Sequence, residues 1–145
     1  MTRTVIMASL ATLYWHPPLQ VGSDNVLPPC PGTPNCVSTE ATRSSQRVPT
    51  VSFTDTPTAA LARAKAALLA EPRTTITAER EGYLHAECKS LVFRFVDDVD
   101  IVVDPVAHVY RFRSASRLGR SDLGVNRKRI ARIAARLALP LTTSK

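Results

Sequence analysis

Long apolar runs are absent from this sequence, and their absence excludes an integral membrane bundle. A helix that spans a bilayer needs roughly 18 to 20 consecutive apolar residues, and no stretch approaches that length. The chain of 145 residues, 44% of them hydrophobic and 21% charged, has the balance of a globular protein. This length allows one core without disulfide or metal staples, so a single domain is expected.

Cysteine is scarce, with three residues at Cys30, Cys36 and Cys88. Cys30 and Cys36 could form a disulfide across the intervening Pro-Gly turn in an oxidising compartment. In the alternative, all three are reduced and Cys88 is a small buried residue of a strand. The spacing is not C-x-x-C and no histidine stands near enough to complete a tetrahedron, so neither a metal site nor a cofactor is predicted.

Recognisable catalytic and nucleic-acid-binding motifs are also missing. The three histidines form no Ser/His/Asp order, which disfavours Ser114 or Ser116 as a nucleophile. The net charge of +7 favours anionic partners in general. The basic stretch 111–136 lacks a helix-turn-helix, an aromatic RNA-binding motif and zinc ligands, so nucleic acid is disfavoured as the partner.

Residues 1–22 place Arg3 before an apolar stretch from Val5 to Trp15, the layout of a short signal peptide. No clean small-x-small cleavage site follows, so a membrane-proximal anchor and a docked first helix are alternatives. Membrane association through this segment is therefore open, as is the choice between an exported or envelope-anchored protein and a cytoplasmic one.

Residues 23–56 form an arm rich in proline, serine and threonine. Proline removes backbone donors and fixes φ, which excludes regular helix and central strand here. A domain of residues 57–140 is expected to follow this ordered or partly ordered arm.

Two helices are predicted in that domain. Thr56 as N-cap and Pro57 at the first helical position open an alanine-rich helix through Glu71, with its leucines on one face. Ser121 is expected to cap a second helix, Asp122 to Ala138, whose apolar stripe docks on the sheet. The residues of that stripe are Leu123, Ile130, Ile133, Ala134 and Leu137.

Strand-like segments with short turns lie between the helices. Alternation places Leu91, Phe93 and Phe95 on one buried face. The fold predicted is α+β: an antiparallel sheet of four to five strands with both packing helices on one face, preceded by the Pro-rich N-terminal arm. The expected strands are Arg73–Glu79, Tyr83–Lys89, Leu91–Val96, Val99–Val103 and His108–Arg113.

Three islands of sequence carry a family resemblance: PCPGTPNCVST (29–39), FRFVDDVDIVV (93–103) and RFRSASRLGRSDLGVNRKRI (111–130). Together they resemble the bacterial and plant family DUF1499, and the match includes the arm from about residue 29. Thr39 and Arg120 depart from the family pattern without removing a charged or cysteine position. The family has no established activity, so the resemblance implies no mechanism.

An acidic cluster is the first candidate site, comprising Asp97, Asp98, Asp100 and Asp122. Paired carboxylates could divide acid and base roles or hold a hard cation. In the alternative these acids meet the arginines of the third island. Adjacent strand residues point to opposite faces, so Asp97 and Asp98 are not expected to share a site.

An anion pocket at the start of the second helix is the other candidate, because helix N-termini and arginines both attract anions. The alternative is a salt-bridge lattice that ties Arg113 and Arg117 to the acids. The candidate ligand-binding residues are Arg113, Ser114, Ser116, Arg117, Ser121, Asn126 and Arg127.

The leading functional hypothesis is a non-enzymatic binding or envelope-associated accessory domain. Its sheet and helices would enclose a modest apolar pocket with arginines at the mouth, suited to a small anionic or lipid-like amphipathic ligand. One alternative is a hydrolase-like or metal-dependent enzyme that uses Asp97, Asp98 and the loop 114–122. The other is a module whose arm and basic helix bind a protein partner.

Overall fold

The structure is a computed structural model and describes residues 21–139. Residues 1–20, which hold most of the expected signal or anchor segment, lie outside the described residues. None of the helices within 21–139 has the length and apolar character needed to cross a bilayer.

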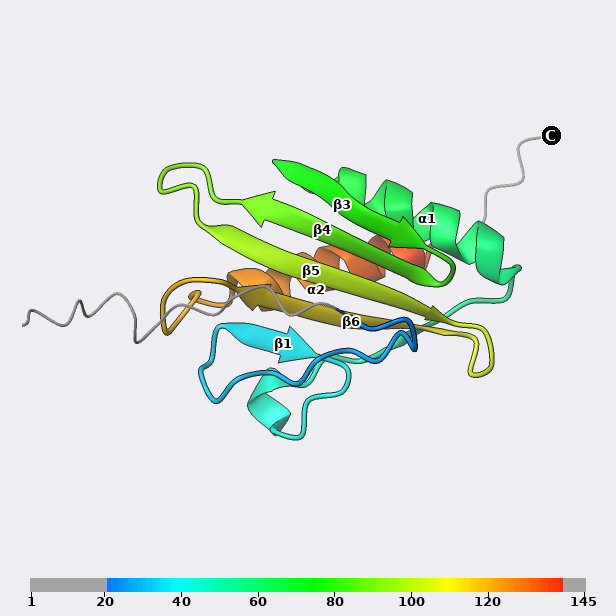
Figure 1. The fold of residues 1–145 in the computed structure, drawn as a ribbon, viewed down its shortest axis with the longest axis horizontal. Coiled ribbons are helices and arrows are strands. Elements are labelled where there is room, and N and C mark those ends of the chain that lie inside the picture. The colour runs from blue at the N-terminus through cyan, green and yellow to red at the C-terminus, as the bar shows by residue number, and fades with distance from the viewer. Residues whose placement is uncertain (1–20, 140–145) are drawn as a thin grey trace, which may run out of the picture.

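One six-stranded antiparallel sheet carries both helices on a single face (Figure 1). The path through the sheet is β1-β6-β5-β4-β3, and β2 also pairs with β6. This confirms the predicted α+β class and antiparallel sheet, with more strands than expected. The strands are β1 (Cys36–Ser38), β2 (Val51–Ser52), β3 (Thr74–Arg80), β4 (Tyr83–Lys89), β5 (Val96–Asp104) and β6 (Val109–Ser116).

The arm supplies the extra strands. Both β1 and β2 lie against β6, with a short 3-10 turn, η2 (Ser44–Gln46), between them in the chain. Proline is tolerated beside a sheet edge, where a missing backbone donor breaks no ladder. The arm is therefore ordered, and it contributes edge strands rather than central ones.

Helix α1 (Pro57–Leu69) begins as predicted, since the Thr56 side chain accepts a hydrogen bond from the Ala59 amide at 3.2 Å. It ends two residues before the expected Glu71. Alanines line its buried face together with Leu68, whereas Leu69 is exposed. The expected leucine face is thus correct for Leu61 and Leu68, which pack in or against the core, and wrong for Leu69.

Helix α2 (Val125–Leu137) begins later than predicted. Gly124, with φ of 79°, is its N-cap, and Ser121 does not cap it. The Asp122 carboxylate accepts from the amides of Gly124 at 3.0 Å and Asn126 at 2.9 Å, so it occupies the helix start. Leu123 is exposed, so the predicted apolar stripe is correct only from Ile130 onward.

The predicted strand Leu91–Val96 is wrong. Residues 90–95 form the loop between β4 and β5, and Leu91 and Phe93 are exposed rather than buried. β4 extends to Lys89 and β5 pairs antiparallel with β4, so the chain must reverse its direction within residues 90–95. The other predicted strands are present. Tyr83–Lys89 matches β4 at both ends, and the ends of the other three are shifted by one to three residues.

The sheet is covered on both faces. The face toward α1 and α2 holds the main apolar core, including Ile101, Phe112 and Ile133. On the opposite face, arm residues Val21 and Leu27 form a smaller cluster with Tyr83 and Val102 of the sheet. The early arm, blue in Figure 1, runs along this second face.

Candidate functional site

The polar residues of the third island meet at Asn126, which is fully buried. Its amide nitrogen donates to Ser116 Oγ at 2.9 Å, Asp122 Oδ2 at 2.7 Å and the Asn35 carbonyl at 3.2 Å, and its oxygen accepts from Ser114 Oγ. These contacts join α2, β6 and the loop before β1. Ser114 and Ser116 are consequently engaged in packing rather than open to a ligand.

Arg129 completes this network on the helix side of the sheet. Its guanidinium donates to Asn126 Oδ1 at 2.8 Å and to Asp97 Oδ2 at 2.7 Å. Sequence reasoning did not single out Arg129. Arg129 follows Asn126 by three residues and precedes Ile133 by four, so it lies on the buried face of the helix. This helical spacing could have predicted its burial from the sequence.

Asp98 and Asp100 lie on the other face, as strand alternation predicts, and His85 bridges them. His85 Nδ1 is 2.8 Å from Asp100 Oδ1, and Nε2 is 3.2 Å from Asp98 Oδ1. Tyr83 donates to Asp100 Oδ1 at 2.7 Å. Sequence reasoning missed His85 and Tyr83, which reach these acids through the pairing of β4 with β5.

Arg117 closes the lattice at one end. It donates to both Asp98 oxygens, at 2.7 and 2.8 Å, and to Glu87 Oε1 at 2.6 Å. Burial tends to raise the pKa of Asp98, but hydrogen bonds from His85 and Arg117 hold that pKa below its usual value. The hydrogen bond to Asp98 in turn raises the pKa of Arg117. Arg117 therefore behaves as the lattice interpretation expected.

His85 is a cation in this setting. Burial alone would lower the pKa of His85, but its hydrogen bonds to Asp100 and Asp98 raise that pKa to about 9. Both ring nitrogens then donate to carboxylates, so neither is available as a general base.

Arg113 differs from Arg117 and Arg129 because its ion pair is too long for a hydrogen bond. The residue is 4% exposed, and its contact with Asp100 is an ion pair of 3.7 Å between Nη1 and Oδ2. Among residues 21–139, neither Arg113 Nε nor Asp100 Oδ2 has a hydrogen-bond partner. Burial lowers the pKa of Arg113 despite the nearby carboxylate. Two opposite buried groups thus keep unused hydrogen-bonding capacity.

The remaining candidates lie elsewhere. Arg127 donates to the carbonyls of Arg47 at 3.0 Å and Ser45 at 2.6 Å, and Ser121 Oγ accepts from the Leu123 amide. The structure therefore does not bring the seven predicted ligand-binding residues into one pocket. Asp122 also takes the place at the α2 start where an anion was expected.

The family model "Protein of unknown function (DUF1499)" matches residues 26–137. The chain belongs to the DUF1499 family. No curated protein matches it. Much of the RSAS…SD…N segment of this DUF1499 chain lies in the Asn126 network, which gives that segment a structural role.

The two cysteines of the first DUF1499 island are bonded to each other. Cys30 and Cys36 form a disulfide with a Cα–Cα distance of 5.7 Å, as the sequence suggested. Cys88 is free and buried, and burial raises the pKa of its thiol.

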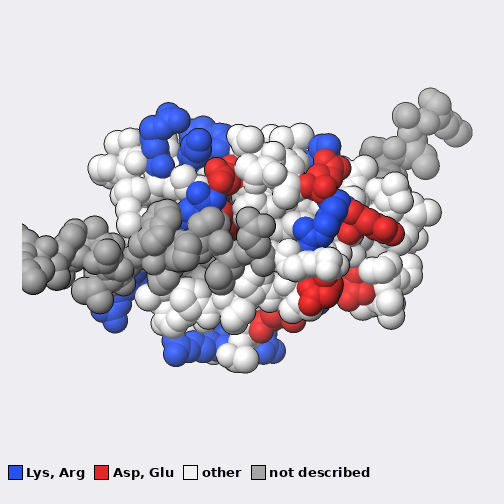
Figure 2. Space-filling model, viewed as in Figure 1, with Lys and Arg blue, Asp and Glu red and all other residues white. Residues whose placement is uncertain are grey.

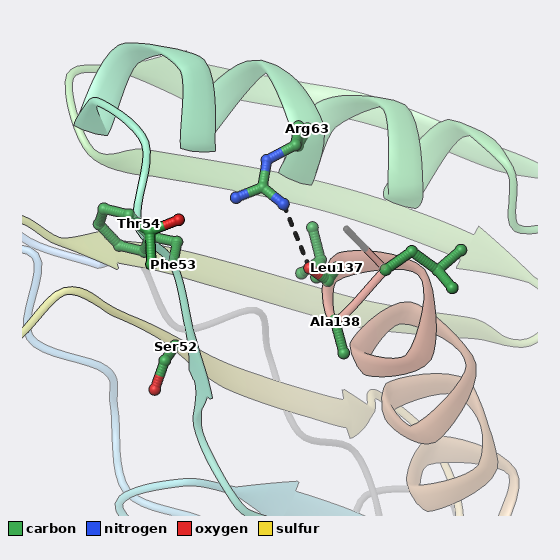
Figure 3. Close-up of a pocket in the computed structure, with 7 residues that line it drawn as sticks. Ser52, Phe53, Thr54, Arg63, Leu137 and Ala138 are labelled. Atoms are coloured by element: carbon green, nitrogen blue, oxygen red, sulfur yellow. Dashed lines mark hydrogen bonds between the residues drawn. The ribbon is translucent and has the colours of Figure 1, made fainter. Parts of the chain in front are cut away.

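Two hollows of the DUF1499 domain do not involve the predicted site residues. One, of about 210 Å³, lies between Phe53, Arg63 and Leu137 (Figure 3). Its arginine is satisfied by Asp55 at 2.8 and 2.9 Å and by the Leu137 carbonyl at 3.2 Å. The other, of about 680 Å³, lies beside Arg80 and the turn at Gly82. Within residues 21–139, no group of three His, Cys, Asp or Glu side chains could hold a metal ion.

Proposed function

We propose that this DUF1499 domain is a non-enzymatic binding protein whose ligand is a small anion held by Arg113. The observation that carries this proposal is the buried Arg113 guanidinium. Among residues 21–139, its Nε has no hydrogen-bond partner, and its Nη1 lies 3.7 Å from Asp100 Oδ2, which has none either. Buried polar atoms without partners are costly, and native proteins rarely retain them without a reason.

The chemistry of these two groups defines the ligand class. A carboxylate or phosphate accepts the fork of guanidinium donors, and a hydroxyl on the same molecule can donate to Asp100 Oδ2. A small hydroxy acid or phosphate ester meets both demands. An apolar tail would suit the neighbouring cluster of Val21, Leu27 and Val102.

Local charge neither attracts nor repels such a ligand strongly. Three cations, His85, Arg113 and Arg117, face three carboxylates, Asp98, Asp100 and Glu87. The affinity for the ligand must therefore come from the directed hydrogen bonds of Arg113 rather than from an excess of positive charge around the site. A bridging water would also satisfy both groups across 3.7 Å, and the experiment must distinguish water from ligand.

The test is native mass spectrometry of the full chain purified from its own source, followed by titration with phosphate, glycerate and octanoate. We expect a retained or saturable small molecule whose affinity falls at least about ten-fold in Arg113→Ala, because a charge-assisted pair is lost. Arg113→Lys should restore charge without restoring the planar fork and should bind weakly.

Arg111→Ala is the matched control. Arg111 lies two residues away on the same face of β6 but pairs with Glu40 and Asp104, so binding should persist. Equal ligand retention in folded Arg113→Ala protein would exclude this site. An absence of retained mass and of saturable binding to all three probes would favour the bridging water.

The enzymatic alternative gains no geometric support. Asp97 and Asp98 point to opposite faces and are paired with Arg129 and Arg117 respectively. Ser114 is held by Asn126, so the loop 114–122 offers no activated hydroxyl near a free base.

A further inference from the structure

The loop between β4 and β5 lies at one extremity of the molecule (Figure 1). Large apolar side chains of this loop are exposed. Leu91, Val92 and Phe93 are 73%, 76% and 75% exposed, and the nearby Phe95 is also exposed. Single exposed apolar residues are common, but a consecutive group marks an interaction site.

This loop has a defined conformation. The Ser90 amide donates to the Phe95 carbonyl at 2.9 Å, and the Phe95 amide donates to Ser90 Oγ at 2.9 Å. Arg94 takes a left-handed φ of 54°, and the rings of Phe93 and Phe95 stack at 5.4 Å. The hydrogen bonds and the turn thus hold the apolar side chains outward.

The charged residues around the loop are mainly cationic. Lys89 and Arg94 are exposed within or beside it, and Arg73 joins them by donating to the Lys89 carbonyl at 2.8 Å. Of the acids nearest this end, three are paired with arginines: Asp97 with Arg129, Glu87 with Arg117, and Glu71 with Arg132 and Arg136. The fourth, Asp122, has its carboxylate bonded to the amides of Gly124 and Asn126. Figure 2 shows Lys and Arg at this corner, while Asp and Glu gather mainly toward the opposite end.

A second loop adds to the same surface. Residues 117–124 follow β6 at this end of the sheet, where the Arg117 amide donates to the Val96 carbonyl at 3.0 Å. Leu118, Arg120 and Leu123 of this loop are exposed. Two adjacent loops therefore combine exposed apolar side chains with exposed cations.

We propose that this end of the molecule docks on an anionic lipid bilayer. The apolar tip of 91–95 enters the interface, while Lys89, Arg94 and Arg120 meet phosphate headgroups. A projecting apolar tip ringed by cations matches a bilayer surface in shape and in charge. This role is independent of the Arg113 site, whose residues belong to β4, β5 and β6.

The test uses the full chain, so that residues 1–20 contribute equally to every variant. Its partition is measured on phosphatidylcholine vesicles with and without about 30% phosphatidylglycerol. We expect Val92→Ser/Phe93→Ser to weaken partition at least about ten-fold on the anionic vesicles, since two inserting side chains are lost. Lys89→Gln/Arg94→Gln should weaken partition on anionic vesicles and leave the weaker binding to neutral vesicles unchanged.

Val106→Ser is the matched control, because Val106 is 91% exposed in the β5–β6 turn at the opposite end of the sheet. A dye attached to the loop distinguishes its insertion from membrane binding by other parts of the chain. An environment-sensitive dye on Leu91→Cys should increase in fluorescence on vesicles and be quenched by brominated lipid. The fluorescence of the same dye on Val106→Cys should not change. Wild-type protein treated with the dye reagent measures any labelling of the free thiol of Cys88.

Unchanged partition of folded Val92→Ser/Phe93→Ser, or a silent dye at position 91, would overturn the proposal. A loop variant that keeps vesicle binding but loses self-association in sedimentation velocity would reassign the surface to a protein contact.

Discussion

Asn126 shows at the residue scale why the RSAS…SD…N segment is a structural feature. One amide contacts Ser114 and Ser116 on β6, Asp122 before α2, and the Asn35 carbonyl before β1. Such a network fixes the position of a helix only when each member is satisfied, because unmet groups in a low-dielectric interior are costly.

Asn126→Ala is therefore expected to lower the free energy of unfolding by about 3 kcal/mol, since several buried partners lose their hydrogen bonds at once. Urea unfolding followed by circular dichroism measures this change. Lys128→Ala, at an exposed position of the same helix, should stay within about 0.5 kcal/mol of wild type. A cost below about 1 kcal/mol for Asn126→Ala would mean that water replaces the amide without loss.

His85 gives the domain a pH dependence of known sign. Its pKa is raised in the folded state to about 9 from 6.5, so folding stabilises the imidazolium. This contribution is fully present below pH 6.5 and is lost as the pH rises through about 9.

We predict that the free energy of unfolding falls by up to about 3 kcal/mol between pH 6 and pH 10 through this group. His85→Gln should remove that slope, whereas His108→Gln, in an exposed turn, should retain it. The measurement is urea unfolding across the pH series. A slope unchanged by His85→Gln would show that the imidazolium between Asp98 and Asp100 does not contribute.

Residue predictions from the sequence succeeded where the determinant is local along the chain. The Cys30–Cys36 bridge and the Thr56 cap depend on spacings of a few residues. His85 escaped notice because its partners are defined by the pairing of β4 with β5, which the sequence does not specify. Arg113 was predicted as a ligand-binding residue because it lies in the third island of sequence. That its guanidinium lacks a close partner is visible only in the fold.

At the scale of elements, both helices and most strands were predicted from the sequence. The errors lie where the tertiary fold determines whether a segment is a strand or a loop, or where a helix begins. The alternation in 91–96 satisfies a strand pattern, yet this stretch becomes a projecting loop because β4 ends at Lys89 and β5 must return beside it. The α2 start moved from Ser121 to Gly124 because Asp122 and the turn before Val125 supply the cap instead. Both differences arise at reversals of the chain, where several residues can serve the same local role.

At the scale of the whole molecule, the arm is part of the sheet rather than a tail upon it. Its strands extend the β6 edge, and Arg80 donates to the carbonyls of Val21 and Gly22 on the opposite face. Arm amides also bond to the sheet, as Thr39 does to Phe112 at 2.9 Å and Phe53 to His108 at 3.0 Å. Removing these contacts would expose the edge of β6 and the apolar cluster of Tyr83 and Val102.

Native-state hydrogen exchange should therefore find the Thr39 and Phe53 amides opening with the whole domain, within about 1 kcal/mol of the amides of β5. The Val106 amide, bonded only to Asp104 in a turn, should exchange by local fluctuation. Reduction of Cys30–Cys36 extends the test, because a bridge closing so short a loop stabilises by about 2 kcal/mol. If arm and sheet form one cooperative unit, reduction lowers the exchange free energy of β5 as much as that of Thr39. Loss confined to the arm would instead make it a separately docked segment, able to leave the edge of β6 while the rest of the sheet stays folded.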